Sequence, residues 1–195
     1  MAAYPPDWSR PWWRGWQAWV EPVWGEWHQL SGKQTHDTAV LPDVLNRVDP
    51  SSPVRFVPQA ALPDGQSYED FIFAHRQVPT RDNVHDLFNA CCWRRFPLTK
   101  SRLNALQAQV IERDGVGATR GPLRDALTLF DENALLLQAP LAVWEALQQH
   151  DWHTLLVVHR RHWGETGLIH PVVFGHALLE KLCQTYKSIT AHAFG

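Results

Sequence analysis

Polar residues suited to metal binding or acid–base chemistry recur at helical spacing in two segments of the sequence. The first segment carries four of them at positions i, i+3, i+4 and i+7: Asp82, His85, Asp86 and Asn89. In the second, His176 precedes Glu180 by four residues. Because side chains three and four positions apart share one face of a helix, each segment would present imidazole and carboxylate groups together.

Two kinds of chemistry fit such faces. The first is metal binding, because zinc and other first-row metal ions accept imidazole nitrogen and carboxylate oxygen. A divalent ion would then be held between the two helices. Its ligands would be Asp82, His85, Asp86, His176 and Glu180. Without a metal, a carboxylate fixes the tautomer of an imidazole for acid–base work, and the catalytic candidates are His85, Asp86 and Asp125. Neither spacing is an established metal motif, so a solvated polar face or a structural hydrogen-bond network remains the alternative.

Basic residues in the same region suggest an anionic ligand. The substrate-binding candidates are Arg81, Asn89, Lys100, Arg120 and Arg124. The glycine-rich loop beside Arg120 would let backbone amides approach an anion, and guanidinium groups suit phosphate or carboxylate. The loop matches no established phosphate-binding motif, and the alternative is that Arg120 and Arg124 form structural ion pairs with nearby acids.

The helices that would carry these groups are marked by capping residues, prolines and apolar spacing. Thr80 is the predicted N-cap of a helix that presents Val84, Leu87, Phe88 and Cys91 to the core and ends before Pro97. A second helix is expected over 98–113, with Gly115 just beyond its end. Shorter or later helices are expected after Ser67 and at about 140–149, 152–163 and 172–186.

Extended structure is expected in two places. Residues 54–57 form a short piece of alternating character within a Pro-, Ser- and Asp-rich segment. Two apolar runs flank the turn-like tripeptide Asp131-Glu-Asn, which predicts a β-hairpin at about 123–138. A helix over 125–138 is the alternative.

Tryptophan is concentrated at the start of the chain, where seven of the eleven fall within the first 27 residues. Ser9 as N-cap and Pro11 in the first turn predict a helix whose aromatic stripe contains Trp8, Trp12, Trp16 and Trp19, with Pro22 ending it. The stripe would lie across the core or form a surface for a partner or for self-association.

The bulk composition indicates a folded, single-domain chain. Its 195 residues are 45% hydrophobic, and the net charge of -2 gives no overall attraction for nucleic acid or membranes. Three cysteines, two of them adjacent, fit a reducing compartment, and neither a leader nor a transmembrane segment is visible, so we expect a cytoplasmic protein. The expected fold is mainly α with a small β-hairpin, built from a Trp-rich helix (1–30), a connecting segment (31–66) and a helical core (67–195).

Four motifs, in this order, resemble a bacterial family known as domain of unknown function 3025. They are VPTRDNVHDLFNA at 78–90, FPLTKSRLN at 96–104, RGPLRDALTLFDEN at 120–133 and FGHALLEK at 174–181. The resemblance implies no reaction, cofactor or partner. The sequence departs from the family pattern at Ala134, where a glycine is expected, and the pattern is expected to continue beyond Gly195.

Three functions follow from these patterns. The first is a metal-assisted hydrolase or phosphoesterase that acts on an anionic small molecule. The second is a nucleic-acid or anion-binding module, in which the phosphate contacts would be Arg94, Arg95, Lys100 and Arg102. The third is a structural or adaptor protein that uses the Trp-rich helix as its interface.

Overall fold

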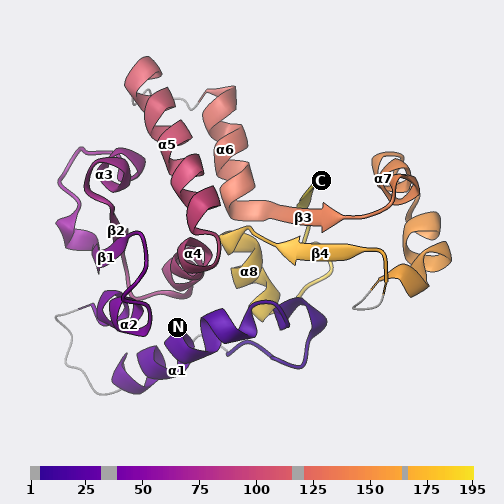
Figure 1. Cartoon of the computed structure of the whole chain (residues 1–195), viewed down its shortest axis with the longest axis horizontal. Coiled ribbons are helices and arrows are strands. Elements are labelled where there is room, and N and C mark those ends of the chain that lie inside the picture. The colour runs from indigo at the N-terminus through magenta and orange to yellow at the C-terminus, as the bar shows by residue number, and fades with distance from the viewer. Residues whose placement is uncertain (1–4, 32–38, 116–120, 164–166) are drawn as a thin grey trace.

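A computed structural model describes residues 5–31, 39–115, 121–163 and 167–195. Most of these residues are helical, and the strands form one sheet of two and one of three (Figure 1). The prediction of a mainly α fold with minor β structure is therefore confirmed. Among the described residues, no helix is both long and apolar enough to cross a membrane.

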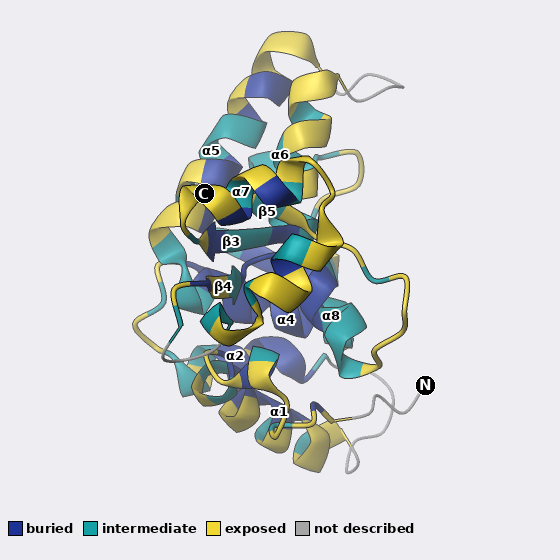
Figure 2. Ribbon diagram, turned by 90° about the vertical axis from the view of Figure 1, so that its right-hand side faces the viewer, coloured by how far each residue is buried: buried dark blue, intermediate teal, exposed yellow. Residues whose placement is uncertain are grey.

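Helix α4 (Val84–Arg95) lies at the centre of the main core. Its side chains Leu87, Phe88 and Cys91 are completely buried, as their spacing predicts. Three other helices pack against it: α1 (Gln17–Ser31), α5 (Pro97–Asp114) and α8 (His176–Cys183). Buried residues gather in the middle of the molecule, while the outer ends of α5 and α6 are exposed (Figure 2). Because α4 contacts both α5 and α8, it can carry groups that meet residues from both.

The Trp-rich segment differs from the single helix that we expected. A short 3-10 turn, η1 (Pro11–Trp13), precedes α1, and Pro22 lies inside α1 instead of ending it. Inside a helix a proline removes one backbone hydrogen bond and crowds the carbonyl four residues before it, so Pro22 destabilises α1 locally but does not end it. Four of the rings, Trp13, Trp16, Trp24 and Trp27, are buried, which agrees with packing on the core.

The segment expected to be a simple connection contains helix α2 (Leu41–Val48). Its own N-cap residue, Val40, supplies no capping side chain. The carboxylate of Asp82 does so instead, accepting the backbone N–H groups of Val40 and Leu41 at 2.7–3.1 Å. This helix was missed because its start depends on a residue about forty positions away.

A small parallel sheet leads into α4. Strand β1 (Arg55–Pro58), the predicted extended piece, pairs with β2 (Gln77–Thr80). Thr80 therefore belongs to a strand and is not the N-cap of α4. That position is held by Asn83, whose side chain accepts the N–H of Asp86 at 2.7 Å. Since α4 begins at Val84, Asp82 lies outside the helix on which we placed it.

Two other helix boundaries agree with the sequence. Helix α3 (Tyr68–His75) begins with Ser67 as N-cap, and the hydroxyl of Ser67 accepts the N–H of Asp70. Helix α5 ends at Gly115, whose φ of 73° favours glycine. A 3-10 turn, η2 (Gln59–Ala61), connects β1 to this region.

The predicted hairpin at 123–138 is wrong. Helix α6 (Pro122–Asn133) occupies most of it, and only β3 (Ala134–Gln138) is a strand. Proline at the first helical position starts α6, and Asp131-Glu-Asn forms its last turn instead of a hairpin loop. β3 pairs with two later strands, β4 (His170–Val173) and β5 (His192–Phe194), antiparallel and parallel respectively.

The rest of the C-terminal third also differs in part from the prediction. Helix α7 (Leu141–Gln148) is present. The helix expected at 152–163 is irregular: two α-helical residues lead into a π-helix, η3 (Thr154–Val158), and a 3-10 helix, η4 (Arg160–His162), follows. The helix expected at 172–186 is strand β4 followed by α8. Helix α7 lies at the far end of β3 from α2 and α3 (Figure 1). Side chains of β3, α7 and η3 form a small separate apolar cluster with Ile169.

Candidate acid–base site

The structure brings His85 and His176 into direct contact. His85 lies in the first turn of α4, and His176 is the first residue of α8. Their Nε2 atoms are 3.1 Å apart, and the two rings meet edge to face at 77°. The prediction that two helices turn imidazoles toward each other therefore agrees with the observed geometry.

The other nitrogen of each ring faces an oxygen acceptor. His85 Nδ1 lies 2.9 Å from Glu180 Oε2, and His176 Nδ1 lies 2.9 Å from the backbone oxygen of Asp131. Each Nδ1 therefore carries a hydrogen that it donates. The two Nε2 atoms form a hydrogen bond only when one of them is also protonated.

Burial determines whether His176 is charged. The side chain of His176 is only 7% exposed, and desolvation lowers its pKa to about 4; the charges of Lys100 and His85 lower it further, against the opposing effect of Asp131. His176 is thus neutral near pH 7 and presents a lone pair at Nε2. This lone pair faces Nε2 of His85 at 3.1 Å.

A buried polar network continues from His176 into the protein. The Asp131 carboxylate lies 2.5 Å from Lys100 Nζ, and Lys100 also donates to Asn89 Oδ1 at 2.8 Å. Asn89 in turn donates to the hydroxyl of Tyr68 at 3.1 Å. Burial raises the pKa of Asp131, but the opposing effects, led by the charge of Lys100, outweigh it, so the pKa is lowered and the carboxylate stays ionised. Lys100 is 4% exposed, and its charge is therefore balanced inside the protein.

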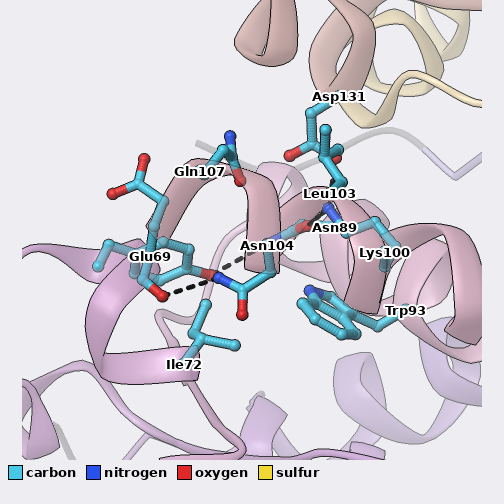
Figure 3. Close-up of a pocket in the computed structure, with 10 residues that line it drawn as sticks. Glu69, Ile72, Asn89, Trp93, Lys100, Leu103, Asn104, Gln107 and Asp131 are labelled. Atoms are coloured by element: carbon cyan, nitrogen blue, oxygen red, sulfur yellow. Dashed lines mark hydrogen bonds and ion pairs between the residues drawn. The ribbon is translucent and has the colours of Figure 1, made fainter. Parts of the chain in front are cut away.

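A small cavity adjoins the inner end of this network (Figure 3). Its volume is about 20 Å³, which is room for about one water molecule. Figure 3 shows the side chains of Asn89, Lys100 and Asp131 together on one side of it, with the ring of Trp93 next to Lys100. The Lys100 ammonium is 5.5 Å from the centre of that ring, which provides a cation–π contact. This cavity is too small for a substrate. The residues that line it therefore support the site from the protein interior.

Gly175 explains how His176 comes to lie beside Asp131. The backbone N–H groups of Phe174 and Gly175 both donate to the carbonyl of Ala134, directly after α6 ends. A Cβ at Gly175 would collide with the backbone oxygen of Glu132. The absence of a side chain therefore lets the start of α8 touch the last turn of α6.

Three of the five predicted metal ligands meet, and two do not. His85, His176 and Glu180 are contiguous, although Glu180 contacts Nδ1 of His85 and not the space between the rings. Asp82 caps α2, and Asp86 accepts three hydrogen bonds from Arg81. Within the described parts of the chain, no three His, Cys, Asp or Glu side chains form a group that could hold a metal ion.

The remaining predicted residues are scattered. Asp125 is exposed in the first turn of α6 with Arg124 beside it, and the structure gives neither a contact with the histidines. Arg120 lies outside the described residues. Lys100 and Asn89 belong to the buried network, and Arg81 has 60% of its side chain exposed.

The four cations of the predicted nucleic-acid surface do not share one exposed face. Arg94 is buried against Asp49, with 7% of its side chain exposed, and Lys100 is buried against Asp131. Arg95 is partly buried, and only Arg102 is exposed.

Cys91 and Cys92 are also buried. Burial raises the pKa of both thiols, that of Cys91 to about 12, as expected for unreactive cysteines.

Asp131 and Tyr68 are the residues of the site that the sequence did not single out. A signal for them existed in α5, where Lys100 and Asn104 fall in the same helical stripe as the buried Leu103, Ala108 and Ile111. A lysine on an apolar stripe requires a buried acidic partner. Asp131 was expected only as a structural ion-pair partner of Arg120 or Arg124, and the structure pairs it with Lys100 instead.

A family model with the description "Protein of unknown function (DUF3025)" matches residues 54–195. A search of the curated proteins and a search of the solved structures give no significant match. The matched region contains the whole of the histidine site and its supporting network.

Proposed function

This chain belongs to the family described as a protein of unknown function (DUF3025), which supplies no activity, and we propose that its His85–His176 pair is the general acid–base centre of a hydrolase. One observation carries the proposal. The two Nε2 atoms are 3.1 Å apart while each Nδ1 is held by an oxygen, so a proton on Nε2 of His85 would face the lone pair of neutral His176. A proton donor and a proton acceptor at hydrogen-bond distance are what acid–base catalysis requires.

His85 is the residue that would contact the substrate. Its side chain is 37% exposed, and that of Glu180 is 43% exposed, whereas His176 is almost completely buried. Glu180 behind Nδ1 orients the His85 ring and stabilises its charged form, as a carboxylate does for a catalytic histidine in general. His176 acts through His85, so we assign it as a positioning residue.

Nε2 of His85 would act first as a general base and then as a general acid. Nε2 of His85 takes a proton from a water molecule as the water oxygen bonds to the carbonyl carbon or phosphorus of an ester or phosphoester. The same Nε2–H then donates that proton to the leaving-group oxygen as its bond to the carbon or phosphorus breaks, and the resting state returns. Arg81 is the cation that we assign to an anionic group on the substrate, because 60% of its side chain is exposed and Asp86, the residue after His85, holds its guanidinium through Nε and Nη2.

The test is hydrolysis of simple chromogenic esters by the purified chain in the presence of EDTA. The probes are p-nitrophenyl phosphate, bis(p-nitrophenyl) phosphate and the mono-p-nitrophenyl ester of succinate, with neutral p-nitrophenyl acetate for comparison. We expect at least one anionic probe to be hydrolysed, and His85→Gln to lower kcat/KM by about 10²- to 10⁴-fold.

Two further variants distinguish catalysis from structural damage. His176→Gln should shift the pH dependence of kcat, because it replaces the partner of the shared proton, and His153→Gln, at an exposed position, should change nothing. If no probe is hydrolysed, or if His85→Gln is as active as the wild type, the proposal fails.

The same geometry supports a metal-assisted variant of this reaction as a second candidate. Metal-binding histidines usually donate the other ring N–H to a carboxylate or carbonyl, as both histidines do here. The 3.1 Å separation of the Nε2 atoms is also close to the roughly 3.3 Å between two nitrogens on one tetrahedral zinc ion. Activity that is lost in EDTA and restored by zinc would favour this candidate, and activity that persists in EDTA would favour the metal-free site.

A further inference from the structure

A second concave site lies on the other side of α8. It is a groove of about 750 Å³, within the size range of small-molecule pockets. Leu178 and Leu182 of α8 line it, and each follows a residue of the histidine site by two positions. Two positions on a helix correspond to a rotation of about 200°, so the groove and the acid–base site are separate.

The groove is apolar with a positive charge. Its walls come from the η1 region, strand β4 and residues 189–191, and Trp12, Trp16, Val172 and Ile189 are among its lining side chains. Arg14 and Arg95 also line it, whereas none of the described lining residues is an Asp or a Glu. An apolar surface with cationic groups and no acidic ones is complementary to a ligand with an apolar body and a negative charge.

In the part of the chain that the structure describes, the guanidinium of Arg95 contacts aromatic rings and no carboxylate. Its guanidinium lies over the rings of Trp16, at 4.5 Å, and Phe96, at 5.0 Å, and Nη1 is buried without a hydrogen-bond acceptor. The indole Nε1 of Trp12 is likewise buried without an acceptor among the described residues. Buried donors without acceptors are costly, and these two belong to residues that line one groove.

The surroundings keep the guanidinium at this position. A Cβ at Gly15 would lie 2.9 Å from Arg95 Nη2, so the absence of a side chain at Gly15 leaves space for the charged group against the backbone. Burial lowers the pKa of Arg95, which means that its charge is incompletely solvated. An anion in the groove would compensate for that lost solvation.

We propose that this groove binds a small amphipathic anion, with its apolar chain along the groove and its carboxylate on Arg95 and Trp12. A carboxylate offers acceptors only, and its two oxygens match the paired N–H groups of a guanidinium. A neutral apolar ligand would fill the same volume but leave both donors unpaired. The charge of the ligand is therefore the feature that the site selects.

Calorimetric titration of the full chain with three probes tests this proposal. Dodecanoate has both the chain and the charge, dodecanol has the chain alone, and acetate has the charge alone. We expect dodecanoate, kept below its micelle concentration, to bind at least about tenfold more tightly than either of the others, as expected for one charge-assisted hydrogen-bond pair. Equal binding of dodecanoate and dodecanol, or no binding of dodecanoate, would overturn the proposal.

Variants locate the binding site. Arg95→Met keeps an apolar side chain and should weaken dodecanoate binding by about tenfold, while Arg95→Lys, which keeps the charge without the planar fork, should be intermediate. Arg102→Met, at an exposed position on α5, is the matched control and should bind as the wild type does. Undiminished binding by a folded Arg95→Met variant would contradict the assignment. So would sedimentation showing a dimer that Arg95→Met dissociates and dodecanoate does not, because the groove would then be an interface between two copies.

Discussion

Burial and charge act on His176 in opposite directions, and burial prevails. The ring lies next to ionised Asp131, which favours the imidazolium, but desolvation lowers its pKa to about 4. The result is a histidine that stays neutral through the physiological range and presents a fixed lone pair to His85. The same desolvation that makes it a good acceptor also makes the folded state sensitive to acid.

Stability should therefore fall as the pH falls from about 7 toward 4. In the unfolded chain His176 binds a proton near the ordinary histidine pKa of 6.5, but in the folded chain only near 4, so the unfolded state gains protons first. Between about pH 7.5 and about pH 5 this one residue should cost about 2 kcal/mol. Urea unfolding of the wild type and of His176→Gln at the two pH values measures it.

In the His176→Gln variant that part of the pH dependence should disappear, whereas His153→Gln should keep it. An equal loss of unfolding free energy in the wild type and in His176→Gln would show that the histidine is not held neutral by burial.

At the scale of elements, two contacts that are distant in sequence fix where helices begin. Gly175 lets α8 begin against the end of α6, and Asp82 fixes the start of α2. Asp82 has two possible roles with different consequences. A capping carboxylate stabilises a helix, whereas a metal ligand supports activity. The hydrogen bonds to Val40 and Leu41 favour the first.

Asp82→Ala should destabilise the chain by about 1–2 kcal/mol, the usual contribution of an N-cap side chain, and should leave the hydrolysis of p-nitrophenyl probes unchanged. Asp82→Asn is the matched control, because an amide oxygen still accepts the two backbone N–H groups. Thermal unfolding and the ester assay together check this expectation. A loss of activity in Asp82→Asn at unchanged stability would instead support a role in the site.

The helical face of α4 and the His176–Glu180 pair could be predicted because their information is local, in the spacing of residues within one helix. So could the ends of α3 and α5, which Ser67 and Gly115 mark. What failed depends on tertiary contacts: the cap of α2 comes from Asp82, and the assignment of α6 was obscured by a turn-like tripeptide that forms its last turn. The Lys100–Asp131 pair could not be predicted while α6 was interpreted as a hairpin.

At the scale of the whole molecule, the apolar interior is divided unequally. The main cluster joins the N-terminal segment with α2, α4 and α8, while the small cluster contains Leu137, Val143, Ala146, Leu155 and Ile169. Fewer buried side chains hold α7 and the turns after it. Local opening costs less free energy where less apolar surface is buried, so the two regions should differ in stability.

Amide hydrogen exchange should show this difference directly. Protection in α7 should be lower than in α4 and α8, and Leu155→Ala should lower it further without changing protection in α4. Exchange followed by mass spectrometry of peptides resolves the two regions. Equal protection of α7 and α4, or a loss in both regions when Leu155 is replaced, would indicate that the chain opens as one cooperative unit.

Helix α8 lies near the end of the sequence, so it is synthesised after most of the chain. His85 and His176 are 91 residues apart, and β3 is completed by strands that follow it. While a ribosome has not yet reached α8, α4 has no partner for its imidazole and the groove lacks one wall. Both sites are therefore assembled only after α8 has been synthesised, and a product terminated before that helix would contain neither.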